Sequence, residues 1–108
     1  MTFEEYQKAA RRTQNGELST TERMRHGLYG LASETGEVLA LFQKGYQGHP
    51  VDKERVMDEC GDVLWMLAEV ADCVGFTLDQ AAQHNADKLW RRYPTGFDSV
   101  RSVHRGEE

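Results

Sequence analysis

A long amphipathic helix is predicted by residues 52–75, which read DKERVMDECGDVLWMLAEVADCVG. Its apolar residues recur at alternating steps of three and four, which places them in one row along a helix. Asp52 is of the residue type that caps helix N-termini, and Gly75 is of the type that commonly ends helices. The row consists of Val56, Glu59, Val63, Met66, Val70 and Cys73. Glu59 is therefore the one charged residue in an otherwise apolar row.

Three further helices follow from capping signals in the rest of the sequence. Each begins at a Thr or Ser that is followed three residues later by Glu or Gln, a pattern in which side chains satisfy N–H groups of the first turn. These helices are expected over about residues 2–14, 19–44 and 77–93. Two glycines and a proline within residues 45–50 predict a loop between the two long helices.

The composition favours a single all-α domain. The chain has 108 residues, and its eight Val and no Ile against nine Ala and nine Leu make it poor in strand formers. A chain of this length can bury a core without metal or disulfide staples. We expect an antiparallel four-helix-type bundle over residues 1–97, followed by a polar, loosely held tail over residues 98–108.

Charge and hydropathy exclude several classes of function. The net charge of −5 argues against a non-specific nucleic-acid binder. No apolar run approaches the roughly 20 residues that cross a membrane, and the N-terminal residues lack the basic and apolar regions of a signal peptide. We therefore expect a cytoplasmic protein without a nucleic-acid or membrane partner. Cys60 and Cys73 are too far apart on one helix for a disulfide, and both are expected to be buried as small apolar residues.

Paired carboxylates interrupt both long apolar rows. The row of the helix over 19–44 consists of Leu31, Glu34, Val38 and Leu41. Each row glutamate has an acidic companion three residues later, Glu37 after Glu34 and Asp62 after Glu59, so the two members of each pair share a helix face. Antiparallel packing of these helices brings the four carboxylates together. Like charges in a small volume repel unless a cation lies among them, and oxygen-only ligands suit Mg²⁺ or Mn²⁺.

The residues around these acids argue against a di-iron site. A di-iron centre in a helical bundle normally shows Glu-x-x-His pairs, and no histidine of this chain lies three residues after a glutamate. Each acidic pair encloses a glycine, Gly36 or Gly61. Since glycine within a helix costs about 1 kcal/mol relative to alanine, we expect these two to permit close helix packing or to leave room for a ligand.

Basic and aromatic side chains supply candidate substrate contacts. Asn85, Lys88 and Arg92 share one face of the helix over 77–93, and such a set suits phosphate oxygens, although a solvated basic helix end has the same appearance. Lys44 and Arg55 are within reach of a phosphate and are equally well placed as ordinary surface charges. An aromatic surface for a base is available in the side chains of His26, Tyr29, Trp65 and Trp90, which alternatively belong to the core or to a dimer interface.

The ordered combination of these motifs resembles the MazG-like branch of the all-α nucleoside triphosphate pyrophosphohydrolases. The resemblance rests on Glu34-x-x-Glu37, Glu59-x-x-Asp62 and the segment Asn85-x-x-Lys88-Leu89-x-x-Arg92-Tyr93-Pro94-x-Gly96-Phe97. It implies hydrolysis of a nucleoside triphosphate to monophosphate and pyrophosphate. It also implies that the four acids bind Mg²⁺, that Lys88 and Arg92 contact phosphates, and that Asn85 and Tyr93 hold the substrate. A homodimer or a dimer of dimers is implied as well.

One position departs from the family pattern. Some relatives carry a glutamate directly before the first metal ligand, where it can activate water, and this chain has Ser33 there. Activation by Mg²⁺ together with one of the four acids is expected instead. A phosphoribosyl-ATP pyrophosphohydrolase, an enzyme directed at dCTP or dUTP, and a non-catalytic partner-binding bundle remain as alternatives.

Overall fold

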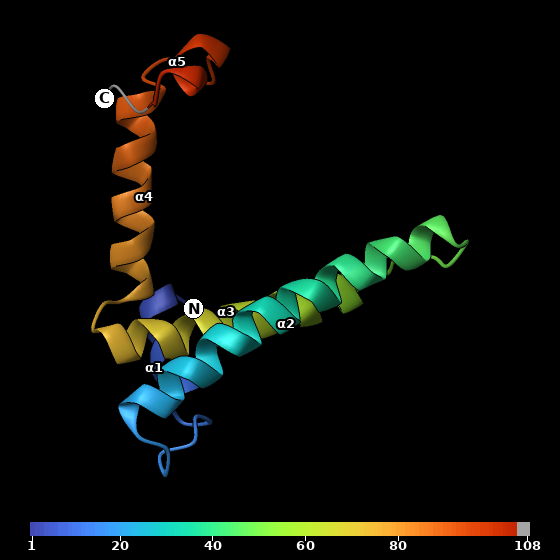
Figure 1. The fold of residues 1–108 in the computed structure, drawn as a ribbon, viewed down its shortest axis with the longest axis vertical. Coiled ribbons are helices and arrows are strands. Elements are labelled where there is room, and N and C mark those ends of the chain that lie inside the picture. Colours follow the sequence, from blue (N-terminus) through green and yellow to red (C-terminus); the bar gives the residue numbers. More distant parts are fainter. Residues whose placement is uncertain (106–108) are drawn as a thin grey trace. The chain divides into compact units, whose positions relative to one another are not determined.

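The computed structural model describes residues 1–105, which are helical throughout apart from short connections (Figure 1). The chain divides into two compact units, residues 1–78 and the residues that follow, and each unit is described by itself. The helices are α1 (Phe3–Arg11), α2 (Thr20–Tyr46), α3 (Lys53–Val74), α4 (Leu78–Arg92) and α5 (Ser99–Val103). The expected all-α class is confirmed, because no strand forms among these described residues.

The predicted caps start the first three helices. The Oγ1 of Thr2 accepts the N–H of Glu5 at 3.1 Å, and the Glu5 carboxylate accepts the N–H of Thr2 at 3.2 Å, which completes a capping box. Ser19 caps α2 through the N–H of Glu22, and Asp52 caps α3 through the N–H of Glu54. Local sequence therefore determines where these helices begin.

The C-terminal end of α3 agrees with the sequence-based prediction, whereas the C-terminal end of α2 does not. Gly75 ends α3 with a φ of 99°, in the left-handed region that glycine adopts without a steric penalty. In contrast, α2 continues through Gly45 to Tyr46, two residues past the predicted end. The chain turns instead at Gly48, whose φ is 94°.

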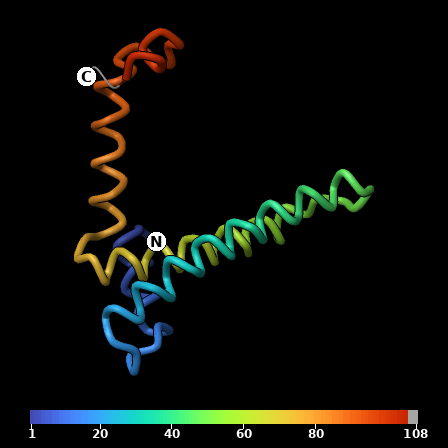
Figure 2. The backbone as a smooth tube through the Cα atoms, viewed as in Figure 1, coloured from blue at the N-terminus to red at the C-terminus, as the bar shows by residue number. Residues whose placement is uncertain are grey.

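Helices α2 and α3 lie antiparallel, side by side, joined by the short connection over residues 47–52 (Figure 2). Their close approach occurs at Gly27 and Gly30 of α2. A Cβ on Gly27 would lie 2.9 Å from a methyl group of Val70, and a Cβ on Gly30 would overlap the Met66 side chain. The absence of a side chain at these two positions therefore permits close packing of α2 against α3.

A small core joins α1 to α3 within the first unit. The fully packed residues are small or aliphatic, and aromatic side chains cover their edges. The core consists of Ala10, Ala68, Ala71 and Leu78, with Tyr6, Leu64, Trp65 and Phe76 packed against it. Alanines at these positions let α1 lie close to α3 and bring Tyr6 toward the acidic part of α3.

One buried side-chain amide connects α1 to the C-terminal end of α3 through hydrogen bonds. Gln7 is 3% exposed, and its Nε2 donates to the carboxylate of Asp72 at 2.9 Å and to the carbonyl of Phe76 at 3.2 Å. Its Oε1 accepts the N–H of Leu78 at 2.8 Å. Arg11 adds two hydrogen bonds to Asp72, at 3.1 and 2.8 Å. This polar cluster satisfies groups that burial would otherwise leave without partners.

The second unit contains a helix that the sequence analysis does not predict. Asp98 caps α5 by accepting the N–H groups of Val100 and Arg101. The Arg101 guanidinium donates to the main-chain carbonyls of Arg91 and Arg92, at the end of α4. The part of the expected tail over residues 98–105 is therefore partly helical, and residues 106–108 lie outside the described part. No helix within residues 1–105 is long and apolar enough to cross a membrane.

The cysteines fit the prediction in part. Both are free thiols, as expected. Cys73 is half-buried, but Cys60 is exposed, so the expectation of a buried Cys60 is wrong. Cys60 lies between Glu59 and Gly61, next to the apolar row of α3 and not in it.

Candidate metal and phosphate site

The two interrupted rows face each other in the first unit. Every member of the α2 row and every member of the α3 row is partly or fully buried. Glu34 and Glu59 are accordingly half-buried among apolar neighbours, on two different helices. Removal of charged carboxylates from water is unfavourable unless a partner neutralises them. The placement of these two acids therefore requires an explanation beyond packing.

Three of the four predicted acids converge. Glu34, Glu59 and Asp62 each offer a carboxylate oxygen, and these oxygens lie within 4.8 Å of one another. Glu34 comes from α2, whereas Glu59 and Asp62 come from α3, so the group forms only because the helices pack antiparallel. Asp62 is exposed, which leaves the group open to solvent on one side. We call these three residues the carboxylate group.

Glu37 is adjacent to the carboxylate group without belonging to it. It is exposed, and its oxygens are not among those that converge. Its charge nevertheless acts on Glu59. Burial, followed by the negative charges of Asp62, Glu34 and Glu37 and a hydrogen bond with Glu34, raises the pKa of Glu59. The protein itself places like charges together here, and a cation would reverse this effect.

Tyr6 is a neighbour of the site that the sequence analysis does not single out for this role. Burial, and then the Asp62 carboxylate, raise the pKa of the Tyr6 phenol. The phenol therefore keeps its proton near Asp62. The sequence signal for this proximity is the position of Tyr6 on the apolar face of α1, and that signal does not indicate which acid acts on the phenol.

The glycines within the acidic pairs do not serve close helix packing. A Cβ on Gly36 or on Gly61 would meet no heavy atom within 4 Å. The first of the two expected explanations is therefore wrong for both positions. The second, open space beside the carboxylates, agrees with the structure. Close packing occurs instead at Gly27 and Gly30, outside the acidic pairs.

A second buried carboxylate on α3 is absent from the predicted set. Glu69 is 1% exposed, and its Oε1 pairs with the Nδ1 of His26 on α2. His26 also meets the ring of Trp65 edge-on, with ring centroids 6.1 Å apart. The Nε1 of Trp65 donates to the hydroxyl of Thr13 at 2.8 Å. Both residues therefore have partners within the first unit, but only Trp65 packs against the core, whereas the His26 side chain is 47% exposed.

The predicted substrate residues Asn85, Lys88, Arg92 and Tyr93 belong to the second unit. Asn85 is exposed, and the other three are half-buried. The spacing of three and four residues places Asn85, Lys88 and Arg92 along one face of α4, as predicted. Their approach to the carboxylate group stays a prediction, since they belong to a separate unit.

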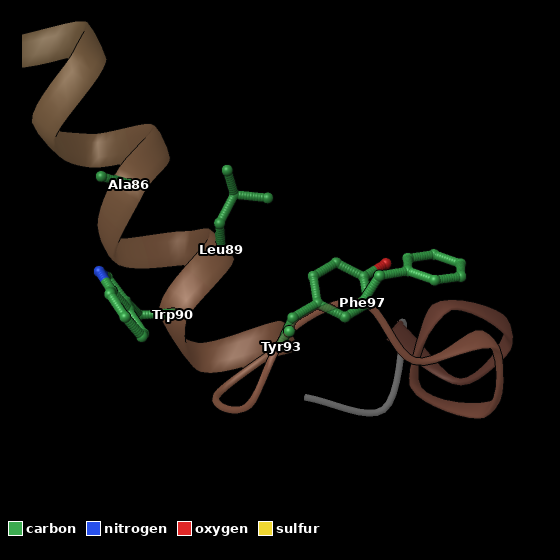
Figure 3. Close-up of a pocket in the computed structure, with 6 residues that line it drawn as sticks. Ala86, Leu89, Trp90, Tyr93 and Phe97 are labelled. Carbon is green, nitrogen blue, oxygen red and sulfur yellow. The ribbon is translucent and has the colours of Figure 1, made fainter.

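An open apolar hollow lies at the C-terminal end of α4, in the second unit. It has a volume of about 430 Å³ and is lined by Ala86, Leu89, Trp90, Tyr93, Gly96 and Phe97. The rings of Tyr93 and Phe97 lie against each other, with centroids 5.6 Å apart (Figure 3). Trp90 is 69% and Phe97 79% exposed. Tyr29, on α2, is also largely exposed, so Tyr29, Trp90 and His26 are the predicted stacking residues whose side chains are accessible.

Comparison with known proteins gives one match. The family described as the MazG nucleotide pyrophosphohydrolase domain matches residues 22–97, which include all eight predicted site residues. No curated protein and no solved structure gives a significant match. The matched range covers well over half of the chain and runs from the first turn of α2 to Phe97.

Proposed function

The chain belongs to the MazG nucleotide pyrophosphohydrolase domain family, and from that membership we propose that it is a Mg²⁺-dependent enzyme that hydrolyses nucleoside triphosphates to monophosphates and pyrophosphate. The single observation that carries the proposal is the convergence of Glu34, Glu59 and Asp62 from two helices. The catalytic domain proposed is residues 1–97. Its substrates are free cytoplasmic nucleotides, and its role is the clearing or limiting of nucleotide pools.

The residues present fit a divalent cation. An octahedral Mg²⁺ holds its oxygen ligands at about 2.0–2.1 Å, so neighbouring and opposite ligands lie roughly 3 and 4 Å apart. The oxygens of the carboxylate group, all within 4.8 Å of one another, match that spacing after small side-chain adjustments. The ligands are all oxygen, which favours Mg²⁺ or Mn²⁺ over zinc or copper. Glu37, one turn from Glu34, completes the proposed ligand set.

The proposed chemistry divides between the ion and the protein. A bound Mg²⁺ polarises a phosphoryl oxygen and lowers the pKa of a bound water. The four acids hold the ion, and one of them accepts the proton of the attacking water, because the hydroxyl of Ser33 is too weak a base for that role. The open side at Asp62 and the space beside Gly36 and Gly61 leave room for the triphosphate.

The face of α4 is proposed to bind the substrate. Lys88 and Arg92 supply positive charge for phosphate oxygens, Arg92 with the fork geometry that suits two oxygens at once. Asn85 donates an amide hydrogen bond. Tyr93, at the rim of the apolar hollow, shapes the place where the nucleoside lies.

The proposed assembly is a homodimer or a dimer of dimers, in which the antiparallel four-helix-type bundle dimerises through its helices. Exposed apolar surface supports this proposal. On α2, a hollow of about 480 Å³ is lined by Gly36, Leu39, Ala40, Phe42, Gln43 and Tyr46. On α4 and the following segment, the side chains of Leu89, Trp90 and Phe97 are also exposed. Contiguous apolar surface of this kind is typical of subunit interfaces.

Product analysis with all ribo- and deoxyribonucleoside triphosphates, with Mg²⁺ and with EDTA, tests the proposal. Monophosphate and pyrophosphate that disappear in EDTA are the expected result. Diphosphate and orthophosphate would contradict the choice of bond. Turnover of phosphoribosyl-ATP alone would assign the first alternative enzyme. Absence of any product, with those substrates and with modified nucleotides, would favour the non-catalytic binding module.

A further inference from the structure

A small hollow lies between the end of α2 and the start of α3, and its lining includes none of the residues of the carboxylate group. Its volume is about 90 Å³, well below the roughly 300–1,000 Å³ of pockets that enclose drug-sized ligands. A site of this size takes a group comparable to a single phosphate and excludes a nucleoside. It is lined by Leu41, Lys44, His49, Pro50, Val51, Asp52 and Arg55.

The charges around this hollow favour an anion. Lys44 and Arg55 are basic residues, and His49 adds a ring that can donate a hydrogen bond. The single acid of the lining, Asp52, already accepts the N–H of Glu54 at 3.0 Å as the α3 cap. Within residues 1–105, the ion pairs are those of Arg11 with Asp72 and of His26 with Glu69. Lys44 and Arg55 therefore carry positive charge that no described carboxylate neutralises.

The hollow lies beside the carboxylate group along the same pair of helices. Arg55 precedes Glu59 by four residues on α3, one turn or about 6 Å along the axis. Lys44 follows Glu37 by seven residues on α2, two turns or about 10 Å. Residues at these spacings share a helix face, so both cations lie on the face that carries the acids. Their long flexible side chains can extend toward the carboxylate group.

We propose that Lys44, His49 and Arg55 bind the β,γ-diphosphate end of the nucleoside triphosphate, the part that departs as pyrophosphate. This inference rests on the proposed function and goes beyond it, because it fixes the direction of the substrate on the helix pair. The distal phosphates carry most of the negative charge of a triphosphate and lie toward the α2–α3 connection. The nucleoside lies on the opposite side of the carboxylate group, away from that connection.

The proposal gives the β- and γ-phosphates contacts of their own, separate from those of the monophosphate part of the substrate. The Arg55 fork holds two oxygens, and the Lys44 ammonium acts as a point charge beside it. A nucleoside monophosphate lacks the distal phosphates, so it does not reach this hollow. Inorganic pyrophosphate occupies it without a nucleoside. Inhibition by these two products therefore reports on two different parts of the site.

The test measures KM for the preferred triphosphate, and inhibition constants for inorganic pyrophosphate and for the monophosphate, in Arg55→Gln and Lys44→Gln. A hydrogen bond to a charged group corresponds to roughly 10- to 100-fold in binding. We expect KM and the pyrophosphate inhibition constant to rise by that factor, while the monophosphate constant stays unchanged. Arg55→Lys keeps the charge without the fork and should recover only part of the loss. Lys53→Gln removes an exposed lysine outside the hollow and serves as the matched control.

Unchanged constants in both glutamine variants, or an equal rise for monophosphate and pyrophosphate, would overturn the proposal. Calorimetric titration of inorganic pyrophosphate in Mg²⁺ provides a readout without turnover. If the wild-type chain hydrolyses no triphosphate, yet its pyrophosphate binding weakens only in the Lys44 and Arg55 variants, the hollow is a diphosphate site and the proposed activity is wrong. If hydrolysis is present and pyrophosphate binding is insensitive to both variants, the activity stands and the hollow does not bind the substrate.

Discussion

The two halves of α3 hold their carboxylates in opposite electrostatic surroundings. In the C-terminal half, Asp72 meets the Arg11 guanidinium and Glu69 meets the His26 ring. In the N-terminal half, Glu59 and Asp62 meet further acids and, within residues 1–105, form no ion pair. The pKa of Asp72 is lowered by its partners, despite the opposing effect of burial, whereas the pKa of Glu59 is raised.

The difference shows how structural acids can be separated from functional ones. A buried carboxylate that meets donors from the same chain contributes to the fold, and its removal weakens packing. A group of acids that the chain leaves without a base carries a cost in the folded state, which a ligand of opposite charge offsets. The N-terminal half of α3 is therefore the part where substitution should affect activity more than stability.

The largest effect is expected for Glu59→Gln. Loss of a metal ligand should lower kcat/KM about 10²- to 10³-fold, because metal-based stabilisation of the transition state amounts to several kcal/mol. The free energy of unfolding without metal should stay equal or rise, since one of several like charges is removed. Glu54→Gln, at an exposed position in the first turn of α3, is the control. A marked fall in the free energy of unfolding with unchanged kcat/KM would instead assign Glu59 a structural role.

The next largest effect is expected for Gln7→Ala, in the half of the molecule where acids are paired. The substitution leaves a cavity and removes the three hydrogen bonds of Gln7 with Asp72, Phe76 and Leu78. It should therefore lower the free energy of unfolding by roughly 3 kcal/mol. Lys8→Ala, on the exposed face of α1, should stay within about 0.5 kcal/mol. Urea denaturation measures both. A loss below 1 kcal/mol for Gln7→Ala would show that the buried amide contributes little.

A somewhat smaller effect is expected from the metal on stability. Because Mg²⁺ binds the folded chain, a concentration 100 times its Kd should stabilise the protein by about 2.7 kcal/mol, observed as a rise in Tm. Glu59→Gln should abolish the rise, and Arg11→Met should lower the Tm while keeping the increment. Equal increments in the wild-type protein and in Glu59→Gln would place the ion elsewhere.

The smallest effect is expected from pH. The folded pKa of Asp72 lies below its unfolded value of about 3.9, so its pairing stabilises the protein above that pH and is lost as pH falls through the folded pKa. Asp72→Asn should be less stable than wild type by about 1 kcal/mol at neutral pH, and the gap should close in acid. The raised pKa of Glu59 gives the opposite sign, with stability lost as pH rises.

Stability curves between pH 3 and 7 for wild type, Asp72→Asn and Glu59→Gln measure both slopes. In Glu59→Gln the decline with rising pH should disappear. If the contributions of Asp72 and Glu59 to stability changed in the same direction with pH, the contrast between the two halves of α3 would be contradicted.

Local sequence patterns predict the parts of the molecule that depend on neighbouring residues. Capping side chains mark the starts of α1, α2 and α3, and the three- and four-residue spacing identifies the rows that face each other. Because Glu34 and Glu59 interrupt those rows, their meeting follows from antiparallel packing in the register that the short connection sets. Glu37 carries the same spacing signal, yet it lies outside the three converging oxygens, since position along a helix does not fix how far a side chain turns.

Contacts between distant residues leave no such pattern. Gln7 finds its partners 65 to 71 residues later, and Glu69 pairs with a histidine 43 residues earlier. A lone polar residue on an apolar face gives no indication of which distant donor will satisfy it. A glycine inside a helix likewise gives no indication of its surroundings. Gly27 permits close packing and Gly36 faces open space, although both lie within α2. The short helix α5 is too brief to produce any periodicity.

The contacts of Gln7 also set an order of events during synthesis. At about 5–20 residues per second, the ribosome adds the intervening 65 to 71 residues in roughly 3 to 14 s after Gln7 is made. Throughout that interval α1 has none of the partners that hold it, and a helix of nine residues is marginal by itself in water. Meanwhile α2 and α3, joined by six residues, can pair as soon as both have emerged. The helix that leaves the ribosome before α2 and α3 therefore joins the fold after they have paired.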